Sequence, residues 1–548
     1  MLCCASALAA PSGVVLNTLS EELQRNFLGL KQKADPPPYF ISYEVTEQEF
    51  HIASASLGAL NSSGDSRNRY LDVSVRIGSP KLDNYHRVRG ERVQFTSGIN
   101  LSLDDNPKAI QQRLWLETDR VYRSAAERLI KIRTNQQVKV AERDSSDDFS
   151  ADPVSTHTEP LHEIKFDRAK WEERLRKVSL AFAQYPALLN SGVLVSTQGD
   201  TRYFVSSEGG RVQHARGFSR IIVSAQAKSV DGMDLADAEY FDAVDAANLP
   251  KDDALLASVA RVASHVEALL KAPVTEPIVG PAIFSGRASG VFFHEIFGHR
   301  IEGHRQKDDT EGQTFTKSLG ERVLPEFLSV DFDATLRKVN GIDLNGWYEF
   351  DDEGIAAKPI RLVDKGVLKA FLMSRSPIDG FVHSNGHGRR QPGLEIVSRQ
   401  SNLLVNSTKT VTAARLREML IEEVKRQNKP YGLYFEDITG GFTTTGRSGL
   451  QAFKVIPVMV YRVYPDGRPD ELIRGADIVG TPLASFSKIL ATSDKMDIFN
   501  GYCGAESGSV PVSAVSPAIL ISEIEIQKKD KSQERPPLLP RPELGPTN

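Results

Sequence analysis

The sequence predicts an α+β protein in which an N-terminal α/β sheet-and-helix domain precedes a C-terminal, mostly antiparallel β domain with one inserted helix. Near the N-terminus, runs with alternating apolar and polar residues (39–60 and 69–80) lie between two amphipathic helical segments, 15–33 and 106–136. From about residue 278 to 527, β-rich runs alternate with glycine-rich turns, and one short helix near residue 294 interrupts them.

Composition excludes several classes of protein. The chain has 548 residues, of which 40% are hydrophobic and 25% charged, with a formal net charge of -4. This length predicts about two to four domains. The chain has no Lys/Arg-rich run of the kind that indicates nucleic-acid binding. No apolar run approaches the roughly 20 residues that a membrane-spanning helix needs, so no membrane span is expected.

Changes in composition divide the chain into six segments. Residues 1–13 are either the end of a signal peptide or a disordered start, because small residues precede Pro11 without a basic region before them. A cytoplasmic location is expected, or export if a truncated signal begins the chain. An α+β domain (14–142), an acidic linker or loop (143–163), a middle α+β segment (164–274), a β-rich domain (275–527) and a disordered tail (528–548) follow.

Local signals predict individual elements within these segments. The middle segment has helices at 166–184 and 251–271 around a strand-rich passage at 191–243. Pro465-Asp466-Gly467 predicts a hairpin turn, and Thr481 followed by Pro482 predicts the start of a helix.

The stretch "GVFFHEIFGHRIEGHR" carries the main chemical signal of the sequence. It resembles the HExxH helix of zinc peptidases, but three residues instead of two separate Glu295 from the second histidine. In a regular helix, positions five apart point roughly 140° away from each other. His294 and His299 therefore share one metal ion only if the helix breaks or contains a π-type turn, which Gly298 permits. Glu295 is then placed to accept a proton from a metal-activated water. Otherwise, the two histidines lie on the surface of an ordinary amphipathic helix.

Residue types alone leave the third metal ligand open. His304, Glu302 and the carboxylates of "FDDEG" (350–354) are candidates. The alternative is that His304 is simply an exposed residue at a helix end and that the "FDDEG" carboxylates belong to a solvated turn. Cys503 is a further candidate, held in a glycine-rich loop before a strand, or else an inert buried thiol. With three cysteines in the chain, a disulfide scaffold is not expected.

Several separated motifs, in this order, resemble the TldD/PmbA metallopeptidase family. They are "HEIFGHRIEG", "FDDEGIAAKPIRLVDKGVLKAFLMSRS", "GHGRR", "SNLLV", "GLYFEDITGG", "IRGADIVGTPLASFSKI" and "NGYCG....VPV". The resemblance is strong over residues 275–527 and weak before them, and the HExxxH pattern is typical of the TldD-type branch. The chain departs from the family at His304, where an acidic residue is common, and in its acidic linker.

The resemblance implies a zinc-dependent peptidase. It assigns His294, His299 and Cys503 as zinc ligands, with Glu295 as general base, and makes the inserted helix a metal-binding helix. It implies cleavage of unfolded or extended peptides inside a homodimer, or a heterodimer with a motif-less PmbA/TldE-type paralogue. Arg389 and Arg390 of "GHGRR" are candidates to bind a peptide carboxylate, and the strand in 453–464 is a candidate edge for main-chain pairing, although solvated arginines and a core strand are the simpler interpretations.

Two other functions fit parts of the sequence less well. A non-catalytic metal-binding regulatory subunit of a TldD/PmbA-type complex is the alternative, and the intact His294-Glu295-His299 set argues against it. A serine hydrolase that uses Ser285 or Ser289 is set aside, because the chain lacks a G-x-S-x-G elbow there.

Overall fold

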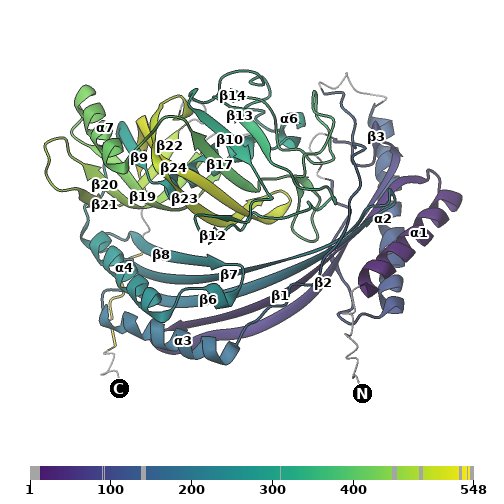
Figure 1. Ribbon diagram of the computed structural model, residues 1–548, viewed down its shortest axis with the longest axis horizontal. Helices are drawn as coiled ribbons and strands as arrows, with labels where there is room; N and C mark the ends of the chain where they lie inside the picture. The colour runs from purple at the N-terminus through teal and green to yellow at the C-terminus, as the bar shows by residue number, and fades with distance from the viewer. Residues whose placement is uncertain are drawn as a thin grey trace, which may run out of the picture.

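The computed structural model describes residues 13–88, 91, 93–136, 144–308, 310–446, 453–480, 485–529, 534–539 and 541–542. The predicted α+β class is confirmed, and the described helices lie at both ends of a long curved sheet and inside the second domain (Figure 1). The helices are α1 (Val14–Lys33), α2 (Pro107–Gln136), α3 (Arg168–Leu180), α4 (Asp252–Lys271), α5 (Gly286–Ile296), α6 (His304–Lys307) and α7 (Ala413–Arg426).

One sheet unites the two N-terminal segments that the sequence analysis separates. Strand β1 pairs with β6 in an antiparallel register from Ser42–Ser206 to Ala55–Val193, and the strand order is β3-β2-β1-β6-β7-β5, with β8 beside β7 and β4 beside β2. Residues 14–142 and 164–274 therefore build one sheet. The strands are β1 (Pro38–Ser56), β2 (Ala59–Ser79), β3 (Leu82–Asp83), β4 (Ile99–Asn100), β5 (Thr156–Thr158), β6 (Asn190–Ser206), β7 (Arg211–Lys228) and β8 (Asp234–Ala243).

The two faces of this sheet differ in chemistry because side chains alternate along each strand. On β1, Ile41 and Val45 belong to a core with α1 and α2, while Ala53 belongs to a core with α3 and α4. The intervening Glu44 faces the other way and bonds residues of the C-terminal domain. The four helices thus cover one face, and the second domain lies over the other (Figure 1).

The acidic segment 143–163 is not a free surface linker over its described part. Asp148 and Phe149 are only 4% and 5% exposed. The Asp148 carboxylate accepts hydrogen bonds from His86 Nδ1 (2.8 Å) and from the backbone N–H of Asp83 (3.0 Å). Phe149 packs under the guanidinium of Arg375 at 4.0 Å, and β5 then adds to the sheet beside β7. The Asp148 side chain therefore has specific partners and is not a solvated linker residue.

The C-terminal domain is built around the long strand β24. It pairs with β17, β22, β23 and β9 within a sheet of order β14-β13-β10-β17-β24-β22-β20-β19-β9, so it connects most of the domain. The strands are β9 (Ile278–Phe284), β10 (Leu328–Phe332), β11 (Lys338–Val339), β12 (Ile342–Asp343), β13 (Ile360–Asp364), β14 (Val367–Leu368), β15 (Gly388–Arg389), β16 (Val397–Ser398), β17 (Asn402–Ser407), β18 (Thr410–Val411), β19 (Gly432–Thr443), β20 (Phe453–Val463), β21 (Glu471–Ile473), β22 (Ala476–Gly480), β23 (Ile489–Ala505) and β24 (Gly508–Lys528).

Three local expectations in this domain have different outcomes. The turn at Pro465-Asp466-Gly467 is confirmed, because β20 turns there into its partner β21. The predicted helix start at Thr481 and Pro482 lies outside the described residues. Strand β20 is not a free edge: it pairs with β19 on one side, and on the other with β22 over residues 453–455 and with β21 over residues 460–462.

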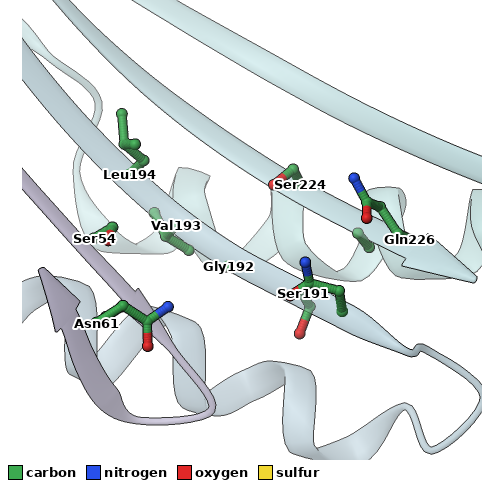
Figure 2. A pocket seen from close by; sticks show the side chains of 11 residues that line it. Ser54, Asn61, Ser191, Gly192, Val193, Leu194, Ser224 and Gln226 are labelled. Atoms are coloured by element: carbon green, nitrogen blue, oxygen red, sulfur yellow. The ribbon is translucent and has the colours of Figure 1, made fainter.

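Both ends of the chain extend beyond the described residues. Residues 1–12 and most of the tail after Lys529 lie outside the described residues. Among the described helices, none is long and apolar enough to cross a membrane. A shallow pocket opens between β1, β2, β6 and β7 (Figure 2), and it is lined by uncharged residues such as Ser54, Asn61, Ser191 and Gln226.

A buried ion pair joins the two domains. Arg390 donates from Nε (3.0 Å) and Nη2 (2.6 Å) to Glu44 on β1, and its Nε lies 3.9 Å from Asp72 on β2. The Arg390 and Glu44 side chains are 3% and 4% exposed. The sheet and the second domain are therefore held together by charges that water does not screen.

Arg390→Ala should destabilise the protein by about 3–5 kcal/mol, because it leaves buried carboxylates without their main counter-charge. Chemical denaturation measures this loss. Arg415→Ala is the matched control, since Arg415 makes only exposed ion pairs and should cost less than about 1 kcal/mol. Equal losses in the two variants would show that the interdomain pair does not stabilise the fold.

Candidate metal centre

Helix α5 is positioned by its cap and by its packing. Ser285 caps it, with its hydroxyl accepting a hydrogen bond from the backbone N–H of Ala288 (3.1 Å). The following turns are buried, and Phe292 and Phe293 are completely covered in the largest hydrophobic core. Because the apolar side chains fix the helix, His294 and Glu295 are carried into the interior on its last turn.

The helix ends immediately after Ile296, between the two histidines. Phe297 closes α5, and a 3₁₀ turn, η3 (Gly298–Arg300), follows. The rings of His294 and His299 come to 5.2 Å between centroids, with 77° between their planes. The expected deformation is therefore a break followed by a tight turn, and no π-type turn occurs within these residues.

Gly298 is required for space. A Cβ at this position would lie 1.9 Å from Oε1 of Gln400, a buried side chain that packs directly beneath the break. Gln400 Nε2 in turn donates to the backbone carbonyl of His294 (3.3 Å). A side chain at 298 would thus displace the group that supports the first histidine.

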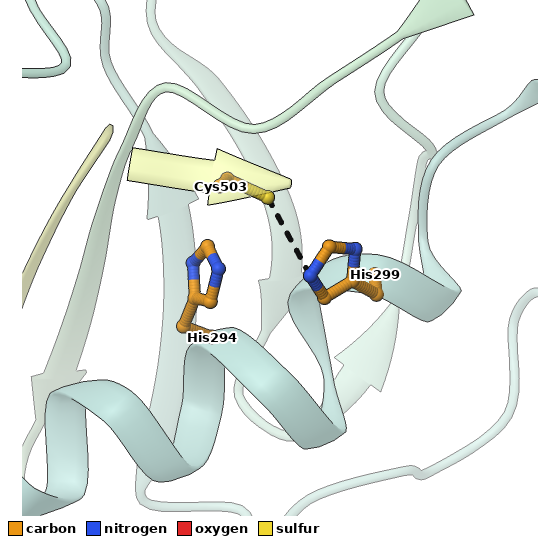
Figure 3. A group of neighbouring side chains, drawn as sticks. All are labelled: His294, His299 and Cys503. Carbon is orange, nitrogen blue, oxygen red and sulfur yellow. Dashed lines mark hydrogen bonds between the residues drawn. The ribbon is translucent and has the colours of Figure 1, made fainter. Parts of the chain in front are cut away.

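Cys503 comes to the same point from β23. Its Sγ lies 3.5 Å from Nε2 of His299, and the donor atoms of His294, His299 and Cys503 all lie within 4.8 Å of one another (Figure 3). The residue is not in a loop, as the glycine-rich sequence suggests, because Cys503 pairs with Val510 across the β23–β24 hairpin. The hairpin fixes the sulfur opposite the broken helix.

The three donors polarise one another. Burial alone would raise the pKa of the Cys503 thiol, but the charges of His299, His294 and Arg399 hold it well below its usual value. Burial likewise opposes the charged form of His299, yet Cys503 and Glu302 raise its pKa well above the usual range. The site thus favours a thiolate, the form in which cysteine binds metals.

Glu302 anchors the second histidine from behind. Its buried carboxylate lies 3.7 Å from Nδ1 of His299, which leaves Nε2 facing the sulfur. Burial would raise the pKa of Glu302, but Arg305 and His299 lower it to about 2. Arg305 Nε donates to Glu302 at 2.8 Å, and Arg399 Nε lies 3.5 Å from its other oxygen. A charged carboxylate that orients a ligating imidazole is a common second layer of metal sites.

Glu295 lies beside the three donors without joining them. Its Oε2 is 4.0 Å from Nε2 of His299, and the residue is 8% exposed. Arg300 Nη1 bonds its backbone carbonyl at 3.2 Å, so the last turn of α5 is held on both sides. A carboxylate at this distance is placed to exchange a proton with a molecule bound among the donors.

The other candidates for the third ligand bind elsewhere. His304 is buried and pairs through Nε2 with Glu506, which contradicts the interpretation as an exposed helix end. Asp351 and Asp352 of "DDEG" are buried as well, and Glu353 is partly buried. Asp351 accepts hydrogen bonds from the backbone N–H groups of Glu353, Ile355 and Gly388.

Arg389 and Arg390 both bond to groups within the protein. Arg390 pairs with Glu44, and Arg389 Nη1 donates to the carbonyls of Gln400 (2.6 Å) and Pro511 (2.7 Å). Both residues are at most 5% exposed. Neither the role in carboxylate binding nor the interpretation as solvated arginines agrees with this packing.

The donor set suits zinc. One thiolate and two imidazoles provide three ligands of the types that Zn²⁺ prefers, and a catalytic zinc site needs a further open position. No fourth protein donor belongs to this group among the described residues. His294, His299 and Cys503 therefore fit a zinc ion with one position left for an exchangeable ligand.

The comparisons with known proteins agree with this geometry. The model of the PmbA/TldA metallopeptidase C-terminal domain matches residues 279–528, which include the broken helix and the β23–β24 hairpin. Residues 279–528 of the chain belong to the TldD/PmbA family.

Relatives and a solved structure place the family relationship along the chain. A metalloprotease of Methanocaldococcus jannaschii is 29% identical over 233 residues, 42% of this chain and 47% of that protein. A protein of Saccharolobus solfataricus named zinc metalloprotease TldD homolog is 24% identical over 251 residues, 45% of this chain and 51% of that protein. The chain thus spans about half the length of the curated relatives it matches.

TldE from Thermococcus kodakarensis has the same fold over a longer stretch. Its crystal structure superposes with a TM-score of 0.60 and 13% identity, and covers 92% of this chain and 100% of that chain. The likeness of fold to TldE therefore includes the N-terminal sheet.

Sequence reasoning missed the residues that hold the three candidate metal donors in place. Arg399 and Gln400 follow the "GHGRR" motif by nine and ten residues, and Arg399 Nη2 donates to the backbone carbonyl of Cys503 at 2.5 Å. No local pattern connects them with residue 294. The available hint in the sequence was a run of polar residues, "SRQSN" (398–402), between two strand-like segments. In the structure all five of these residues are completely buried.

Gly298→Ala should lower zinc affinity by at least about tenfold, because the new methyl group displaces Gln400 from beneath His294. Competition with a chromophoric chelator measures the affinity. Gly29→Ala is the control, since a Cβ there contacts nothing within 4 Å. Removing the obstacle in Gly298→Ala/Gln400→Ala should recover part of the loss, and unchanged affinity in the single variant would contradict this role of Gly298.

Glu302→Gln should lower zinc affinity by about 10–100-fold, because the neutral amide orients His299 less strongly. It should also remove stability that the low carboxyl pKa provides. This stability is present above the unfolded pKa of about 4.3, and it is lost in wild type as the pH falls towards about 2. Chelator competition and denaturation at several pH values test both effects. Glu326→Gln, an exposed control, should change neither.

Proposed function

We propose that this TldD/PmbA family protein is a zinc-dependent peptidase that cleaves unfolded or extended peptides. The observation that carries the proposal is the convergence of two imidazoles, one thiolate and a free carboxylate, Glu295, in the interior. The relatives named metalloprotease, and one named zinc metalloprotease, support the same chemistry.

Each residue has a defined task. His294, His299 and Cys503 hold the metal. Zinc held there would supply the Lewis acid for activating a water and polarising the carbonyl of a peptide. Glu295 accepts the proton of the attacking water and later gives it to the leaving amine. Glu302, Arg305 and Arg399 keep His299 and the Cys503 strand in place throughout.

Burial of the site favours an extended substrate. His294, Glu295 and His299 are only 5%, 8% and 7% exposed, and Cys503 is 2% exposed. A folded domain does not bring its backbone to such a position, whereas a flexible chain can enter. Assembly as a homodimer, or as a heterodimer with a motif-less TldE-type partner, belongs to the proposal.

Glu295→Gln should keep zinc and lose cleavage of an unstructured peptide by at least about 100-fold, because the amide cannot accept a proton. Metal analysis and peptide hydrolysis on the same preparations measure both properties. Glu321→Gln, which changes an exposed glutamate, should leave both unchanged.

Two outcomes would overturn parts of the proposal. Wild-type protein without zinc would contradict the metal assignment. Wild-type protein that binds zinc but leaves every unstructured peptide intact, both alone and with a TldE-type partner, would favour the alternative of a non-catalytic regulatory subunit.

A further inference from the structure

A second group of metal-binding side chains lies where the N-terminal sheet meets the C-terminal domain. His157 belongs to β5, Glu159 follows it, and Glu349 belongs to the loop before "DDEG". Their donor atoms all lie within 4.8 Å of one another. The residues come from both domains, and none of them belongs to the proposed catalytic site.

The distances in this group suit a metal ion better than hydrogen bonds. Nε2 of His157 lies 3.7 Å from Oε2 of Glu159 and 3.7 Å from Oε2 of Glu349, too far for hydrogen bonds. Bonds of about 2.1 Å to one tetrahedral ion place the donors about 3.4 Å apart. This ring nitrogen is inaccessible to solvent and has no hydrogen-bond partner among the described residues. A buried unpaired nitrogen is costly unless something binds it.

Separate contacts hold each of the three side chains in this arrangement. Oε1 of Glu159 accepts from the backbone N–H of Ala215, and Oε1 of Glu349 accepts from Arg337 Nη2. The His157 ring lies 5.0 Å from the ring of Phe350. In each carboxylate one oxygen is thus occupied, and the other, Oε2, remains directed at Nε2 of His157.

We propose that His157, Glu159 and Glu349 form a second divalent-metal site that fastens β5 to the C-terminal domain. One imidazole and two carboxylates are ligands for Zn²⁺ and similar first-row ions. The three side chains are 33%, 25% and 33% exposed, so the remaining coordination positions are open to water. The nearby positive charge of Arg337 and this exposure make the site weaker and faster to exchange than the buried thiolate site. The site is structural and independent of the proposed peptidase chemistry.

Titration of the metal-free full-length chain with Zn²⁺ tests the proposal. Wild type should bind about two equivalents and Cys503→Ser about one, and His157→Ala should lose the weaker equivalent. Glu349→Gln should weaken the same equivalent. Glu163→Gln, an exposed carboxylate of the same segment, is the matched control and should bind like wild type.

Co²⁺ separates the two sites by their spectra. A thiolate-to-cobalt charge-transfer band reports Cys503, and it should be unchanged in His157→Ala, which also shows that this variant folds. Zn²⁺ should slow hydrogen exchange at β5 in wild type and in Cys503→Ser, and fail to do so in His157→Ala. A single zinc equivalent in wild type that His157→Ala retains, or the same weaker equivalent in wild type and His157→Ala, would overturn the second site. Loss of peptide cleavage would leave the proposal of a second metal site unaffected.

Discussion

The structure of the metal centre depends on the end of helix α5 after Ile296. A regular helix would direct His294 and His299 to different sides. The 3₁₀ turn over Gly298–Arg300 cancels this difference and brings the rings to 5.2 Å. The break is held in place by packing: Phe297 is covered by the core, and Gln400 fills the space that a side chain at 298 would need. The five-residue spacing of the two histidines therefore requires the break in the helix, because only the break lets both rings reach one site.

Buried charges around the break are arranged in alternating order. Glu302 lies between Arg305 and Arg399, and Arg305 continues to Glu311 and Glu506. Each charge alone would be expensive to bury, and each has an opposite neighbour. This order explains how a thiolate, two imidazoles and a carboxylate are held together away from water. It also gives His304 a role, because its pairing with Glu506 links α6 to the β23–β24 hairpin.

The sequence was informative where the signal is local. Alternation along 39–60 and the helical spacing of 15–33 predicted β1 and α1 closely. The HExxxH pattern predicted a deformed helix, and the family resemblance supplied Cys503. The rest depends on partners far apart in the chain. Nothing near residue 44 indicates a pairing with Arg390, and nothing near Asp148 indicates His86. Arg389 and Arg390 were misjudged for this reason, since two arginines after glycines look exposed until their buried partners are known.

The N-terminal sheet also supports Cys503, the third donor of the candidate metal centre. Arg220 on β7 pairs with Asp242 and donates to the backbone carbonyl of Asn500, three residues before Cys503 on β23. The backbone N–H of Asn345 donates to Oδ1 of Asn500 (3.1 Å), and its side-chain Nδ2 donates to the carbonyl of Gly501 (2.9 Å). Bonds to main-chain carbonyls fix the strand itself and not only its side chains. The position of the sulfur is therefore set by both domains, and a change in how the sheet lies against the C-terminal domain would be transmitted along β23 to Cys503.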